Sequence, residues 1–285
     1  MRMTAVLITL LIGLTNNALA EEQTAAKWQT DYAEAYKEAR RENKFLLIWF
    51  TNDAMTDAEN EFASLIDDVQ LAPSLTNVLP VRVGKSASVK IDDQSVWLLG
   101  HAAFGELLRL PGLAMIDLRD NRSPHYGNVV SVYPFRSGKP LGKAGLQTLL
   151  NLPTGTLTQR TLIYAVRTHG ESPKSTLGIF DPLLSVESTK HSTHQASINL
   201  QGHHNWGQRF QLISARLPDR LLAQEVCAES WPGQNLVAAA EECVHSWRQS
   251  SGHWSAVSAG HPRYGYDMKR GTNGVWYATG IFGKR

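Results

Sequence analysis

An uninterrupted apolar run, FLLIWF at residues 45–50, constrains the fold of this chain more than any other feature. A run of this length is typical of a strand that is buried on both faces of a sheet. Residues 27–43 precede it and carry aromatic and alanine side chains at helical spacing, which predicts an amphipathic helix. A helix before a buried strand indicates a layered α/β fold.

The rest of the chain alternates between helical and extended patterns, as an α/β fold requires. Further helices are predicted at 57–71, 145–151, 160–167, 183–200 and 236–246, and further strands at 78–83 and 113–118. The C-terminal residues 264–282 predict two more strands, which are joined by a Gly-Thr-Asn-Gly turn at 271–274.

A segment rich in turn-forming residues divides the chain. Residues 134–158 combine Pro, Gly and Lys around a short predicted helix, and 285 residues are enough for about two domains. We therefore predict one domain at 25–155 and a second at 157–285.

The first twenty residues have the parts of a secretory signal peptide. Arg2 supplies the charge, residues 5–14 form a short apolar stretch, and Ala18-Leu19-Ala20 matches a cleavage pattern. The apolar stretch is shorter than the roughly 20 residues of a membrane span, and no later segment approaches that length. We predict a cleaved signal peptide at 1–20 and a periplasmic or secreted protein, an uncleaved anchor being the alternative.

The charge of the chain excludes one class of partner. The formal net charge is +2, and no run of five or six like charges occurs. Nothing in this balance indicates binding to nucleic acid.

The chain has two cysteines, Cys227 and Cys243. Export would place them in an oxidising compartment, where a disulfide can form and persist. We expect a disulfide between them, which would contribute on the order of 3 kcal/mol in the chain-entropy model. Two buried free thiols are the alternative.

Two stretches of the first predicted domain carry a family resemblance. They are the helix and Asn43-Lys44 before FLLIWFT, and PGLAMID at 111–117, where the family places a cis-proline. Both resemble exported thioredoxin-like domains. The family's Cys-x-x-Cys is replaced by TNDAMTD at 51–57, so disulfide exchange cannot begin. The resemblance implies a redox-inactive scaffold or a docking surface for a protein partner, with Thr51, Asn52 and Asp53 as turn and capping residues.

The second half is rich in histidine and carries several motifs in order. They are a His-Ser pair followed by Gln-Ala within 183–200, GHHNW at 202–206, EVCA at 225–228, WRQSSGH at 247–253 and the closing stretch 265–283. Together they resemble the CAP superfamily (cysteine-rich secretory proteins, antigen 5 and pathogenesis-related 1), although Val and Cys replace Asn and Ile of its E-N-I-A motif.

The CAP resemblance implies an α-β-α sandwich with a central cavity lined by histidines and by acidic or polar residues. By this resemblance the cavity residues are His203 or His204, Glu225, Ser250 and His253. Glu229 is the alternative acid. The other histidines of this half, including His191, are expected to be structural or exposed.

Two imidazoles and a carboxylate can hold a divalent metal such as zinc, with water completing the shell. The predicted ligands are His203, Glu225 and His253. Each residue also has a structural alternative. His203 would be a solvated surface residue, Glu225 would accept backbone hydrogen bonds in a loop, and His253 would be a packed histidine beside Trp254.

These features predict an exported, non-catalytic binding protein whose cavity takes a small apolar or cell-envelope ligand. The second hypothesis is a metal-assisted hydrolase acting on cell-envelope peptide, lipid or glycan, with Glu225 as the base. A redox chaperone that uses Cys227 and Cys243 is the third and has the least support, because the two cysteines are widely spaced.

Overall fold

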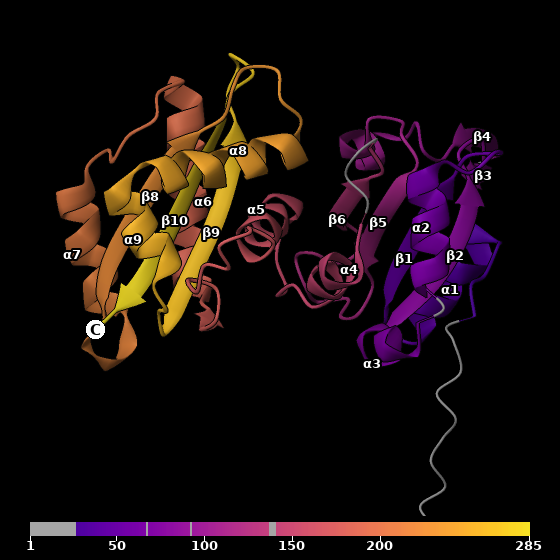
Figure 1. Cartoon of the computed structure of the whole chain (residues 1–285), viewed down its shortest axis with the longest axis horizontal. Coiled ribbons are helices and arrows are strands. Elements are labelled where there is room, and N and C mark those ends of the chain that lie inside the picture. Colours follow the sequence, from indigo (N-terminus) through magenta and orange to yellow (C-terminus); the bar gives the residue numbers. More distant parts are fainter. Residues whose placement is uncertain (1–26, 67, 92, 137–140) are drawn as a thin grey trace, which may run out of the picture.

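The computed structural model describes residues 27–66, 68–91, 93–136 and 141–285, and the predicted signal peptide lies outside them. Two sheets with helices on their faces form an α/β protein, as the sequence predicts (Figure 1). Within the described residues, no helix is both long and apolar enough to cross a membrane.

The first sheet has the strand order β2-β1-β5-β6. β1 runs parallel to β2 and antiparallel to β5, and β6 runs antiparallel to β5. Every residue of β1 is buried, as its apolar run predicts. The strands are β1 (Phe45–Thr51), β2 (Val78–Gly84), β5 (Gly112–Asp117) and β6 (Val129–Pro134).

Alternate residues of β1 pack against opposite layers, because successive side chains of a strand point to opposite faces. Leu46 and Ile48 share an apolar cluster with α1, whereas Leu47 and Trp49 share another with α2. The remaining elements of this half are α1 (Tyr32–Arg41), α2 (Asp57–Ile66), η1 (Val69–Leu71), α3 (Ala72–Leu75), β3 (Ser88–Ile91), β4 (Gln94–Trp97), η2 (Ala102–Leu107) and α4 (Lys143–Leu150).

A buried glutamate closes the loop after β1, at the place where the thioredoxin resemblance would put cysteines. Glu59 is 0 % exposed and accepts four hydrogen bonds of 2.8–2.9 Å, two from Asn52 and two from Thr56. Asn52 thus lies in the loop after β1, whereas Thr51 is the last residue of that strand and not a turn or capping residue. No peptide bond of the described residues is cis, so Pro111 has an ordinary trans bond.

The second sheet has the order β7-β9-β10-β8, with helices on both faces. Ala223 of β8 packs with α6 and α7, whereas Val226 and Ala228 of the same strand pack with α8. The elements are α5 (Leu157–Arg167), β7 (Ile179–Phe180), α6 (Pro182–Ile198), α7 (Trp206–Arg216), η3 (Pro218–Arg220), β8 (Leu222–Glu229), α8 (Leu236–Gln249), α9 (Ser251–Ser258), β9 (Arg263–Arg270) and β10 (Trp276–Lys284).

Gly265 lets α6 lie directly on β9. A Cβ atom at this position would stand 2.3 Å from the backbone of Leu184 and Ser185, so no larger residue fits without displacing the helix. The hydroxyl of Ser188 donates to the carbonyl oxygen of Gly265 at 3.0 Å. This close approach places the buried face of α6 against the sheet.

Helix α5 lies between the two sheets (Figure 1). Arg160 extends toward the first sheet and donates to Oγ of Ser131 at 2.8 Å. Gln159 bonds to Ser185 of α6 on the other side, at 2.9 Å. A single apolar cluster runs from Phe45 to residues of β10, so the segments before and after residue 155 share one core.

The predicted disulfide is wrong, because Cys227 and Cys243 are both buried free thiols. Cys227 and Glu225 are two residues apart on β8, so their side chains point to the same face of the sheet, the one that α6 and α7 cover. Cys243 lies on α8, in the cluster that covers the opposite face of the sheet. The sheet itself keeps the two sulfur atoms apart.

A thiol count tests this arrangement. Because both thiols are buried, we expect no reaction with a thiol reagent in the native mature protein and two reactive thiols per chain after unfolding without reductant. A disulfide would instead require a reductant before either thiol reacted.

Candidate functional site

Three of the predicted cavity residues meet beside β8, an edge strand of the second sheet. Glu225 lies on β8, His203 on the loop between α6 and α7, and His253 in the first turn of α9. Ser250 separates α8 from α9 with extended backbone angles, φ −105° and ψ 112°. This break turns α9 out of the line of α8 (Figure 1) and leaves His253 in contact with His203.

His203 connects the acid to the second imidazole. Its Nδ1 atom lies 3.0 Å from Oε1 of Glu225, and its Nε2 atom lies 3.3 Å from Nε2 of His253. A carboxylate only accepts hydrogen bonds, so Nδ1 of His203 carries a hydrogen and donates it to Glu225. The other ring nitrogen, Nε2, points toward His253, on a side chain that is 40 % exposed.

His204 and Ser250, which the sequence also predicted for the cavity, lie outside this group. Nε2 of His204 meets a backbone carbonyl at 3.2 Å, and its ring packs edge-on against that of His194. Adjacent residues of the loop point in different directions, so only His203 faces the acid. The side chain of Ser250 makes no capping hydrogen bond within the described residues, and the contribution of this residue is the break between two helices.

The carboxylate of Glu225 is buried among basic groups. Its side chain is 0 % exposed, with Nη2 of Arg209 2.5 Å from Oε2 and Nε2 of His191 3.7 Å from Oε1. The arginine forms an ion pair that lacks the alignment of a hydrogen bond. Burial raises the pKa of Glu225, but the hydrogen bond from His203 and the charge of Arg209 outweigh it, so the net pKa is lowered and the group is ionised.

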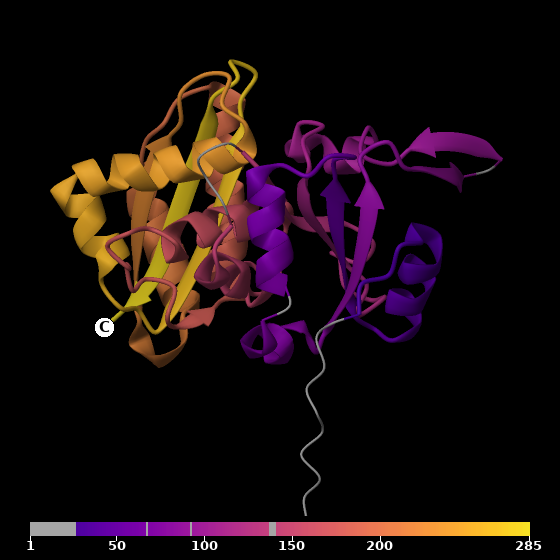
Figure 2. The same ribbon diagram turned by 45° about the vertical axis from the view of Figure 1, so that its right-hand side comes forward.

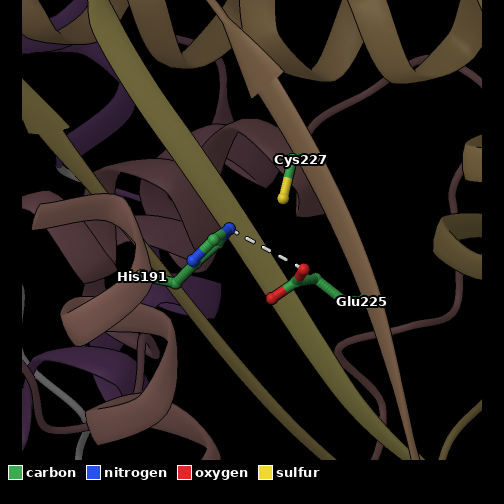
Figure 3. A group of neighbouring side chains, drawn as sticks. All are labelled: His191, Glu225 and Cys227. Carbon is green, nitrogen blue, oxygen red and sulfur yellow. Dashed lines mark ion pairs between the residues drawn. The ribbon is translucent and has the colours of Figure 1, made fainter. Parts of the chain in front are cut away.

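A second set of candidate metal ligands is buried, with side chains that point toward one another (Figure 3). The ligand atoms of His191, Glu225 and Cys227 all lie within 4.8 Å of one another, and all three residues are buried. We refer to these three residues as the inner group.

The inner group is poorly suited to a cation. Burial, with the charge of Glu225, raises the pKa of the Cys227 thiol well above its usual range, so the sulfur stays protonated. Burial lowers the pKa of His191 to about 4, and Nε2 of this neutral ring lies 2.8 Å from the carbonyl oxygen of Gly202, to which it donates. Arg209 already balances the carboxylate, so an added cation would meet a positive charge.

The imidazole pair of His203 and His253 fits a metal better. Two nitrogen ligands of a tetrahedral zinc ion, each about 2.0–2.1 Å from the metal, lie about 3.3 Å apart. The Nε2 atoms of His203 and His253 have this separation. Burial and then the charge of His203 lower the pKa of His253, which favours the neutral ring that a metal requires.

Glu225 does not share a centre with the two histidines, contrary to the predicted ligand set. It contacts Nδ1 of His203, whereas His253 contacts Nε2 on the other side of the same ring. In this arrangement Glu225 contacts Nδ1 and can hold the orientation of the His203 ring, a role that carboxylates commonly have beside histidines that ligate a metal.

His191 and Arg209 belong to the site, although the sequence did not predict them for it. His191, which was expected to be structural or exposed, is buried on the face of α6 that Gly265 allows against the sheet. A signal was present in the helical spacing of this face. Its buried residues include Leu184, Ser188, His191 and Gln195.

Comparisons with known proteins give only a remote likeness. No protein-family model and no curated protein matches the chain. Among solved structures the chain is similar to an outer surface protein from Borrelia burgdorferi, at 20 % identity over 38 % of this chain and 77 % of that chain, with a TM-score of 0.31. A likeness this weak says nothing of function, which is therefore inferred from the chain's own geometry.

Proposed function

We propose that this chain is an exported, non-catalytic binding protein that holds a divalent cation, with zinc as the fitting ion, at His203 and His253. The observation that carries the proposal is the 3.3 Å separation of their Nε2 atoms beside the buried, ionised Glu225. Two protein ligands leave coordination positions open, so the bound ion can accept a donor atom from a cell-envelope ligand.

The strand order of each sheet supports the type of domain that the sequence indicates for each half, although the two halves share one core. The strand order β2-β1-β5-β6 with one parallel pair supports a thioredoxin-like domain at 25–155, which without thiols serves as a scaffold or docking surface. Helices on both faces of the second sheet support a CAP-like domain at 157–285. The signal-peptide pattern at 1–20 supports a periplasmic or secreted location.

The hydrolase and redox hypotheses draw less support from the geometry. A hydrolase would need Glu225 to reach a metal-bound water, but this side chain is 0 % exposed and is engaged by Arg209 and His203. A redox function would need Cys227 and Cys243 to meet, and they lie on opposite faces of the sheet.

Zinc binding to the mature protein, measured by isothermal titration calorimetry, tests the proposal. We expect one site per chain. His253→Ala removes one of two ligands and is expected to abolish detectable binding. Glu225→Gln replaces the charged acceptor that orients the His203 ring by a neutral amide, and is expected to weaken zinc binding about 10–100-fold.

Two further variants make the zinc experiment discriminating. His204→Ala is the matched control, since it removes a neighbouring imidazole that lies outside the pair. Cys227→Ser removes the sulfur of the inner group and is expected to leave zinc binding unchanged. Binding that survives His253→Ala, or that is lost in Cys227→Ser, would contradict the assignment to His203 and His253.

A further inference from the structure

A hollow of about 410 Å³ opens on the α1 face of the first sheet. α1 lies on the side of this sheet that is turned away from the second half (Figure 2). Three buried apolar side chains form its floor: Leu98, Phe104 and Ile116. Its walls include α1 and the β3–β4 hairpin, which projects at the upper right of Figure 2. The volume lies within the range of pockets that hold small organic ligands.

Two phenols stand in this otherwise apolar wall. Tyr32 and Tyr36 are neighbours on α1, with ring centroids 6.1 Å apart, and both line the hollow. Burial, with a smaller effect of Tyr36, raises the pKa of Tyr32 to about 12, so its hydroxyl keeps the hydrogen and can donate it. The wall therefore offers hydrogen-bond donors to a ligand that has acceptor atoms.

The rim of the hollow is basic. Lys37, Lys90 and His101 are exposed and line it, and no carboxylate is found among its described lining residues. Lys37 also pairs with Glu34 beside the rim, at 2.7 Å. Within the described part of the chain, Lys90 forms no ion pair. An apolar floor below cationic groups complements a molecule with an apolar body and an anionic end.

We propose that this hollow binds a single-chain amphiphilic carboxylate of the fatty-acid type. The hydrocarbon chain would contact the floor, and the carboxylate would lie between Lys37 and Lys90, within reach of the tyrosine hydroxyls. The site shares no residue with the proposed zinc site. It assigns the first half a binding activity of its own, independent of metal.

Calorimetric titration of the mature protein with decanoate, in the presence of a chelator, tests this proposal. We expect decanoate to bind. Decanol has the same chain without the charge and is expected to bind about tenfold more weakly, because two partly exposed ion pairs are lost. Decyltrimethylammonium is expected to bind more weakly still, since the rim repels its charge.

Variants locate the binding within the hollow. Ala33→Trp places a large side chain at an exposed lining position of α1 and is expected to abolish decanoate binding without unfolding the helix. Lys37→Ala combined with Lys90→Ala is expected to weaken it about tenfold. The matched control removes two exposed lysines outside the hollow, Lys85 and Lys174.

Decanoate binding is expected to be independent of the zinc site. Decanoate should bind equally to His253→Ala, so loss of zinc binding and loss of decanoate binding are separate results. Binding that is unchanged in Ala33→Trp, or decyltrimethylammonium binding as tightly as decanoate, would overturn the proposal.

Discussion

Replacing Glu225 by alanine is expected to lower the free energy of unfolding by about 3–5 kcal/mol. The change removes the carboxylate that pairs with Arg209 and accepts a hydrogen bond from His203. The Arg209 side chain is only 18 % exposed, so water cannot fully replace its lost partner. A buried charge left without its partner is among the most costly results of a single substitution. Chemical denaturation of the mature protein measures the loss.

Two comparisons separate the effect of the charge from that of the lost side-chain volume. Glu229→Ala makes the same exchange at an exposed position of the same strand and is expected to change stability by about 0.5 kcal/mol or less. Adding Arg209→Met to Glu225→Ala removes the positive charge that has lost its partner and is expected to restore part of the stability. A loss under about 1 kcal/mol in the single variant, or no recovery in the double variant, would contradict this explanation.

The second large effect is expected at Arg160, where methionine should lower the free energy of unfolding by about 3 kcal/mol. The guanidinium is buried and donates to Oγ of Ser131 at 2.8 Å and to the carbonyl oxygens of Leu149, Leu152 and Pro153 at 3.3, 2.9 and 2.8 Å. Methionine has a comparable length but no donor, so these buried acceptors lose their partners. Removal of a buried charge offsets only part of this loss.

The Arg160→Met variant also tests whether the two halves unfold together. α5 carries Arg160 toward the first sheet, and Gln159 of the same helix bonds to α6. Hydrogen exchange should therefore show a joint loss of protection in β1 and β10. Arg122→Met, at a side chain that is 88 % exposed, is the matched control. Loss of protection in β1 alone would instead indicate two independently folding domains.

Local patterns predicted several elements well, although α7 and β8 were not predicted. The apolar run at 45–50 forms β1, the pattern at 183–200 forms α6, and the pattern at 236–246 forms most of α8. The β3–β4 hairpin was not predicted, because its strands pair only with each other and are mostly exposed, which leaves no continuous apolar run. The predicted helix at 57–71 ends at Ile66 as α2.

The sequence by itself determined the α/β class and the availability of one acid and several imidazoles in the second half, because apolar periodicity and residue identity are local properties. Only the tertiary structure decided which atoms meet. The two faces of β8 separate Cys227 from Cys243, and the two nitrogens of His203 separate Glu225 from His253. The separation of the two cysteines and that of Glu225 from His253 depend on which face or edge of the sheet each element covers. Packing between side chains that are distant in the sequence sets this arrangement, so no local pattern can predict it.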